Sequence, residues 1–170
     1  FRNKTVAVVG GANSAASAAL YLSTICKKVY IFYRKHEMRC EPISLDKLKE
    51  KDNVEIVYFA QPTEIKGENK VHGVKVLIEE PNKDPKEVDL KLDGLFVEIG
   101  ATPLIDVVKN LGLKTDCDGY IETDKEMKTS AEGVYAAGDN TNNTLKQVVT
   151  ATGEGATAAK SISEYLKKRK

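Results

Sequence analysis

The chain has 170 residues, of which 41% are hydrophobic and 30% are charged, a composition typical of a soluble globular protein. Its 26 Lys and Arg nearly balance its 25 Asp and Glu, which argues against nucleic-acid or membrane partners that bind through a general charged surface. No apolar run approaches the roughly 20 residues that span a bilayer, and no signal-peptide pattern opens the chain, so we expect a cytoplasmic protein.

The first part of the chain alternates between buried strands and helices. Residues 5–9 (Thr-Val-Ala-Val-Val) form an apolar run, as expected for a parallel strand covered on both faces. Small and apolar residues then recur every three or four positions over 13–26 and predict a helix, which Asn13 or Ser14 can cap. The same signals predict the other elements of a βαβαβ unit: strands at 29–33 and 54–59 and a short polar helix at 44–51.

Short segments separated by turn residues follow and predict an antiparallel meander. Gly67-Glu68-Asn69 and Pro81-Asn82-Lys83-Asp84-Pro85 supply the turns. Three strands are expected between and beside them, at 63–66, 71–79 and 87–92. An apolar strand at 94–99, stopped by Gly100 and Pro103, closes a first domain that we place at residues 1–100.

Residues 101–170 make up a second domain. We expect an amphipathic stretch at 104–111, a short strand at 134–137 and a final helix at 144–166. Gly153 and Gly155 suggest that this helix packs closely against a neighbouring backbone or a ligand. The predicted fold class is therefore α/β: a Rossmann-like parallel sheet with a three-stranded antiparallel meander, followed by a segment of another α/β domain.

The turn after the first strand has the sequence of a degenerate dinucleotide fingerprint, Gly10-Gly11-Ala12-Asn13-Ser14-Ala15. Gly10 allows a sharp turn, Ala15 allows close packing of helix on strand, and the N–H groups of the helix start can face a pyrophosphate. Ala12 places a methyl group where glycine usually permits close approach of a ligand. Taken alone, the motif fits a nucleotide-binding turn and a plain βα turn equally well.

The end of the second strand carries cations and no carboxylate. Tyr33 is followed by Arg34 and Lys35, with Arg39 just beyond. An acidic residue at this place binds the ribose 2′-hydroxyl of NAD, whereas basic residues accept the 2′-phosphate of NADP, and arginine grips phosphate with a planar fork. The pattern favours NADPH, and a solvated cationic loop is the alternative.

These residues carry a resemblance to a known family. Residues 8–15 and Arg34-Lys35-x-x-x-Arg39 resemble the NADPH segment of low-molecular-weight thioredoxin reductases. Residues 94–100 resemble the hinge strand of that family, and residues 129–139 resemble its second flavin motif. The resemblance implies that residues 1–100 bind NADPH and that residues 101–170 are the C-terminal portion of an FAD-binding domain.

The resemblance also assigns roles to single residues. Gly138 and Asp139 correspond to the motif that holds the ribityl–diphosphate region of FAD. Residues 145–149, with Lys146, Gln147 and Val148, match the segment that approaches the isoalloxazine ring at the start of the last helix, although an ordinary helix start remains an alternative. Lys146 replaces a frequent arginine, and Tyr33 stands where a histidine often precedes the basic pair. Ile99 and Gly100, which end the hinge strand, complete the expected cofactor-binding set.

The resemblance implies further residues that this sequence does not contain. The first flavin lobe and a redox Cys-x-x-Cys pair lie upstream of a segment like Phe1–Lys4 in the family, so we expect a piece of a longer enzyme, inactive alone and without catalytic residues of its own. Cys26, Cys40 and Cys117 match no redox position, and their spacing fits neither a disulfide framework nor a metal site.

The complete enzyme so implied passes hydride from NADPH to FAD, reduces its cysteine pair, and then reduces thioredoxin or a similar small disulfide protein, as a homodimer. Two alternatives stay open. One is a ferredoxin- or NADH-linked relative with the same fold. The other is a catalytically silent nucleotide-binding module, which would bind NADPH without flavin.

Overall fold

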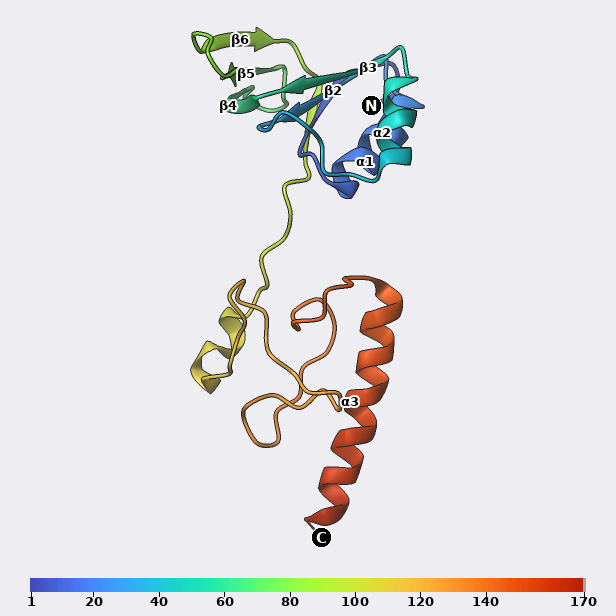
Figure 1. Cartoon of the computed structure of the whole chain (residues 1–170), viewed down its shortest axis with the longest axis vertical. Coiled ribbons are helices and arrows are strands. Elements are labelled where there is room, and N and C mark those ends of the chain that lie inside the picture. Colours follow the sequence, from blue (N-terminus) through green and yellow to red (C-terminus); the bar gives the residue numbers. More distant parts are fainter. Residues whose placement is uncertain (170) are drawn as a thin grey trace. The chain divides into compact units, whose positions relative to one another are not determined.

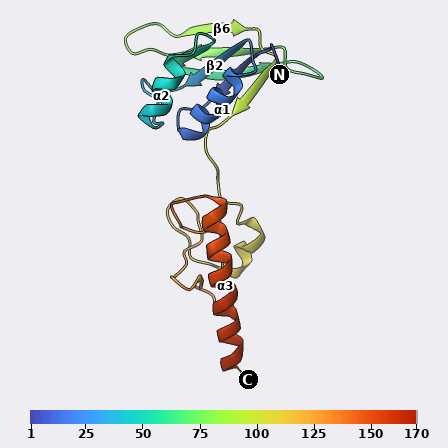
Figure 2. The ribbon, with the colours of Figure 1, turned by 90° about the vertical axis from the view of Figure 1, so that its right-hand side faces the viewer.

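The computed structural model describes residues 1–169, the side chain of Val107 apart. The chain divides into two compact units between Gly100 and Ala101, and Figures 1 and 2 trace the ribbon of each. None of the helices within the described residues is long and apolar enough to cross a membrane.

A four-stranded parallel sheet forms the centre of the first unit, with the strand order β3-β2-β1-β7. Val6, Ala7 and Val8 of the central strand are fully buried, because both faces of the sheet are covered. The strand bounds are Thr5–Val9 for β1, Lys28–Tyr33 for β2, Val54–Tyr58 for β3 and Gly94–Val97 for β7.

Two helices cover one face of this sheet, α1 (Asn13–Ser23) and α2 (Pro42–Lys49), as Figure 1 shows. The buried residues of α1 are Ala15, Ala16, Ala19 and Leu22, and they share a core with Val6, Val8, Val29 and Ile31 of the strands. Because most of these helical side chains are methyl groups, the helix axis approaches the sheet closely.

A three-stranded antiparallel sheet packs on the other face. It consists of β4 (Ala60–Lys66), β5 (Gly73–Ile78) and β6 (Lys86–Leu90). The strand predicted at 63–66 begins three residues earlier, because Phe59 adopts a left-handed conformation (φ 54°) and sends the chain directly from β3 into β4. Pro62 is tolerated because β4 is an edge strand, and the pairing register shifts beside it.

The second unit has little regular structure besides α3 (Val148–Lys168) and the 3₁₀ helix η1 (Asp106–Leu111). The strand predicted at 134–137 is wrong, since the described part of this segment makes only one isolated bridge, between Tyr135 and Lys128. Gly133 and Gly138, both with positive φ, bend the chain at its two ends. A four-residue apolar run needs a neighbouring strand to become regular, and the described residues of this unit form none alongside it.

The final helix also differs from its prediction at the N-terminus, since it starts at Val148 and not at Thr144. Gln147 caps it, and its side chain and that of Thr150 bond each other's backbone N–H groups in a capping box. Close packing of Gly153 and Gly155 against a neighbouring backbone is not found within residues 1–169, because a Cβ at either glycine would have no neighbour within 4 Å outside the adjoining turns of the helix. Close packing against a ligand stays a prediction. The predicted α/β class, with a parallel sheet and a separate three-stranded antiparallel sheet, is confirmed.

Candidate functional site

A cleft of about 670 Å³ lies in the first unit where β1, β2 and β7 end. Ligands of open α/β sheets bind outside the carboxyl ends of the strands, so its position is that of a ligand site. Its walls include the glycine-rich turn, the start of the basic segment, strand β4 and the chain after β7. Nine of the predicted cofactor-binding residues line it: Gly10, Gly11, Ala12, Ser14, Tyr33, Arg34, Arg39, Ile99 and Gly100.

The two glycines of the turn are required by the packing of the protein itself. Gly10 has φ +146°, and a Cβ there would lie 2.2 Å from the carbonyl oxygen of Glu98. A Cβ at Gly11 would lie 2.3 Å from the ring of Tyr33. The turn is therefore held tightly between β7 and β2, with the start of α1 beside it.

The start of α1 carries no side-chain cap, contrary to the prediction for Asn13 or Ser14. Ala12 is the N-cap residue, and the Asn13 Oδ1 instead accepts a hydrogen bond from the Glu41 N–H at 2.8 Å. Ser14 lines the cleft, whereas Asn13 does not, and Ala15 is buried. An uncapped helix start leaves N–H groups available to an anion.

The basic segment after β2 places two of its three cations at the cleft. Arg34 and Arg39 line it, and Lys35 does not. The Arg39 N–H donates to the Gly11 carbonyl at 2.6 Å, and its Nε donates to the Tyr33 hydroxyl at 3.1 Å. Across residues 1–169, neither guanidinium forms an ion pair with a carboxylate.

The second unit has a smaller pocket, of about 280 Å³, beside the predicted flavin residues. Asp139 and Lys146 both line it, with Tyr120 and Asn140. The Lys146 Nζ lies 3.9 Å from the centre of the Tyr120 ring and donates to the Thr141 carbonyl. The Asn140 Oδ1 is buried, and no group of the described chain donates to it.

The other predicted flavin residues do not line that pocket. Gln147 is occupied with capping α3, and Val148, the first residue of the helix, is 85% exposed. Gly138 adopts φ +89° and donates its N–H to Glu154. These three residues therefore flank Asp139 and Lys146 in the fold without sharing a cavity with them.

Glu154 is a positioning residue that the sequence analysis missed. Its carboxylate, in α3, accepts hydrogen bonds from the Gly138 N–H at 2.6 Å, from the Thr141 hydroxyl at 3.2 Å and from the Asn143 amide. Burial raises the pKa of Glu154, but these hydrogen bonds and the charge of Lys146 outweigh it, so that the pKa lies below its ordinary value. A lone carboxylate between two glycines, Gly-Glu-Gly, was the available sequence signal.

A family comparison connects these features. Residues 1–155 match the family model described as pyridine nucleotide-disulphide oxidoreductase. The chain belongs to this family.

Individual oxidoreductases of the family are similar over nearly the whole chain. The thioredoxin reductase of Bacillus subtilis is 37% identical over 166 residues, which are 98% of this chain and 52% of that protein. The thioredoxin reductase of Listeria monocytogenes is 36% identical over 171 residues, which are 100% of this chain and 52% of that protein. The chain thus spans about half the length of the curated relatives that it matches.

Solved structures of thioredoxin reductases have the same fold. That of Lactococcus lactis, in its FR conformation, superposes with a TM-score of 0.85 at 30% identity and covers 99% of this chain and 55% of its own. That of T. acidophilum superposes with a TM-score of 0.82 at 36% identity and covers 98% of this chain and 54% of its own. These likenesses place the chain beside low-molecular-weight thioredoxin reductases within the pyridine nucleotide-disulphide oxidoreductases.

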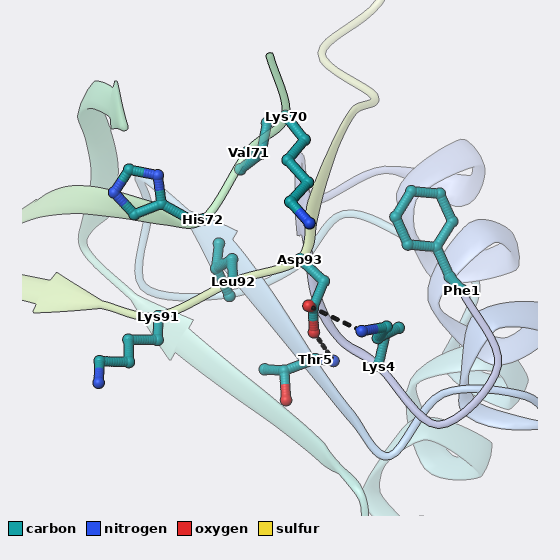
Figure 3. A pocket seen from close by; sticks show the side chains of 9 residues that line it. All are labelled: Phe1, Lys4, Thr5, Lys70, Val71, His72, Lys91, Leu92 and Asp93. Atoms are coloured by element: carbon teal, nitrogen blue, oxygen red, sulfur yellow. Dashed lines mark hydrogen bonds and ion pairs between the residues drawn. The ribbon is translucent and has the colours of Figure 1, made fainter. Parts of the chain in front are cut away.

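Another cleft of the first unit, of about 500 Å³, is lined by three lysines, His72 and the carboxylate of Asp93 (Figure 3). Asp93 accepts the Thr5 N–H at 2.9 Å and pairs with Lys4 at 3.4 Å, and these contacts lower the pKa of Asp93. Figure 3 shows His72 and Lys91 directed away from this pair. Among the residues that the structure describes, no group of three or more His, Cys, Asp or Glu could hold a metal ion.

Proposed function

We propose that the chain forms the NADPH-binding domain, residues 1–100, and the C-terminal portion of the FAD-binding domain, residues 101–170, of a thioredoxin-disulfide reductase. One observation carries the proposal: the glycine-rich turn and the two arginines Arg34 and Arg39 line the same cleft. A pyrophosphate needs backbone N–H groups and a 2′-phosphate needs cations, and this cleft offers both.

Different residues of the cleft would bind different parts of the nucleotide. The start of α1, with Ala12 and Ser14, would bind the pyrophosphate, because its N–H groups carry the positive end of the helix dipole. Arg34 and Arg39 would bind the 2′-phosphate. Ile99 and Gly100 border the cleft beyond β7, and we assign them contacts with the same nucleotide.

For the flavin, the second unit offers a carboxylate and a cation in one pocket. Asp139 is exposed and has no ion-pair partner within residues 1–169, so its oxygens can accept ribityl hydroxyls. When bound, FAD supplies the hydride acceptor that links a nicotinamide to a disulfide.

The cysteines of this chain do not supply the thiol pair of the proposed reaction. Cys26 is buried and Cys40 is half-buried, and burial raises the pKa of both thiols, which disfavours the nucleophilic thiolate. Cys117 is exposed but lies far from both in sequence. We therefore propose that the thiols that reduce thioredoxin, and the contacts of the expected homodimer, belong to the part of the relatives' length that this chain does not span.

The test compares the binding of two nucleotides to the unmodified chain and to two variants, each of which removes one positive charge. NADPH and NADH are titrated into the chain and into Arg34→Ala and Lys35→Ala. Arg34→Ala should weaken NADPH binding by about 10-fold or more, since a hydrogen bond to a charged group contributes about 1.5–3 kcal/mol, and should leave NADH unchanged. Lys35→Ala removes an equal charge outside the cleft and should change NADPH binding much less. Equal affinity of the unmodified chain for the two nucleotides would overturn the proposal.

A further inference from the structure

Tyr33 contacts both halves of the proposed nucleotide site. It ends β2, its side chain is buried, and its ring occupies the space above Gly11. Its hydroxyl accepts a hydrogen bond from the Arg39 Nε at 3.1 Å. One side chain therefore connects the glycine-rich turn to a guanidinium six residues further along the chain.

The bond through Nε leaves the functional end of Arg39 free. A guanidinium has five N–H donors in a planar fork, and the Tyr33 hydroxyl uses the single N–H of Nε. The two terminal NH₂ groups remain for the bidentate contact that a phosphate prefers. A free arginine loses rotamer freedom when it binds, whereas a restrained one has already lost part of that freedom.

The backbone of the same segment is also attached to the turn. The Arg39 N–H donates to the Gly11 carbonyl at 2.6 Å, and the Glu41 N–H donates to the Asn13 Oδ1 at 2.8 Å. These two bonds fix where the Arg39 Cα lies, but they do not orient its side chain. The Tyr33 hydroxyl supplies that remaining restraint.

We infer that Tyr33 is a specificity-determining positioning residue, whose hydroxyl orients the Arg39 guanidinium for the 2′-phosphate of NADPH. This inference rests on the proposed function, because it assumes that Arg39 meets a 2′-phosphate. The ring and the hydroxyl have separate tasks: the ring packs on Gly11, and the hydroxyl restrains the arginine.

Tyr33→Phe separates the two tasks, since it keeps the ring and removes the hydroxyl. Dissociation constants of NADPH and NADH are measured for the chain, for Tyr33→Phe, for Arg39→Ala, for the double variant and for Tyr21→Phe, which alters an exposed tyrosine of α1 outside the cleft. Tyr33→Phe should weaken NADPH binding by about 3- to 10-fold, the range of one hydrogen bond, and leave NADH unchanged. Tyr21→Phe should change neither.

The double variant gives the sharper readout. If the hydroxyl acts through Arg39, then Tyr33→Phe should have no further effect on NADPH affinity in the Arg39→Ala background. Additive losses, equal weakening of both nucleotides, or no change in Tyr33→Phe while Arg39→Ala weakens NADPH, would each overturn the inference and leave the proposed function standing. If the unmodified chain does not prefer NADPH to NADH, the proposed function itself fails. Arg39→Lys, which keeps the charge without the Nε donor, tests the same restraint should Tyr33→Phe not fold.

Discussion

Removal of the Glu154 carboxylate should loosen the turn that carries Asp139. Glu154 accepts three hydrogen bonds, from Gly138, Thr141 and Asn143, and each bond to a charged group contributes about 1.5–3 kcal/mol. The three act as a unit on a half-buried group, so their losses do not add. We expect Glu154→Ala to cost the second unit about 2–3 kcal/mol of unfolding free energy and Glu154→Gln, which keeps one acceptor oxygen, about 1–2 kcal/mol.

The effect should depend on pH in a defined direction. Because the folded protein lowers the pKa of Glu154, the stabilising contribution is fully present above the unfolded carboxyl pKa of about 4.3. It is lost as the pH falls through the lower folded value. The stability difference between the unmodified chain and Glu154→Gln should therefore be constant near neutral pH and shrink below about pH 4.

Hydrogen exchange followed by mass spectrometry measures the local stability of the turn that carries Asp139. Peptides that cover residues 134–143 should exchange about 5- to 30-fold faster in Glu154→Gln, the factor that corresponds to about 1–2 kcal/mol. Peptides from β1 serve as an internal control. Glu164→Gln alters an exposed carboxylate of the same helix, 3.9 Å from Lys160, and should change nothing. Unchanged exchange in Glu154→Ala, or equal acceleration in Glu164→Gln, would refute the positioning role.

Four further substitutions probe the glycine-rich turn, the bond between Asn13 and Glu41, and the flavin pocket. Gly10→Ala should destabilise the first unit by about 3 kcal/mol or more, because its Cβ would meet the carbonyl group of Glu98. Gly100→Ala is the control: it has φ +110° with open space around it, and it should cost about 1–2 kcal/mol. Equal shifts in melting temperature for the two variants would contradict this reasoning. Asn13→Ala should lower the melting temperature by a few degrees through the loss of about 1 kcal/mol, and no shift would show that its bond to Glu41 is not stabilising. In the complete flavoprotein that the proposal implies, Asp139→Ala should release FAD on gel filtration, and full flavin retention would count against the assignment.

The parallel core could be predicted from sequence because its signals are local. The apolar run of β1 stops at a glycine pair, and the small residues of α1 repeat with helical spacing. Each element is recognisable without knowledge of its neighbours, since burial on both faces leaves a continuous apolar run. The same holds for the meander, whose turns contain Gly67 and Pro81.

The sequence predictions fail where the structure depends on residues distant in the chain, or where several residues could cap the same helix. The run at 134–137 has the composition of a strand, but a strand exists only when another segment pairs with it. The final helix could start at any of several polar residues, and the Asn143 Oδ1 accepts a hydrogen bond from the Leu145 N–H at 3.0 Å in a turn that precedes the helix. Only the reciprocal bonds of Gln147 and Thr150 decide the start, and these depend on side-chain geometry.

At the candidate nucleotide site, the sequence motif predicts which residues lie together, but their contacts show why each residue type is needed. Gly10 and Gly11 would be needed for packing against Glu98 and Tyr33 whether or not a nucleotide binds, so the glycines alone do not distinguish a nucleotide turn from a plain one. The arginines do distinguish them. Arg34 and Arg39 line one cleft without ion-pair partners in the described chain, and the Arg39 Nε donates to the Tyr33 hydroxyl. Two guanidinium groups that no carboxylate neutralises can bind a phosphate, which is the physical reason why we propose a nucleotide with a 2′-phosphate here.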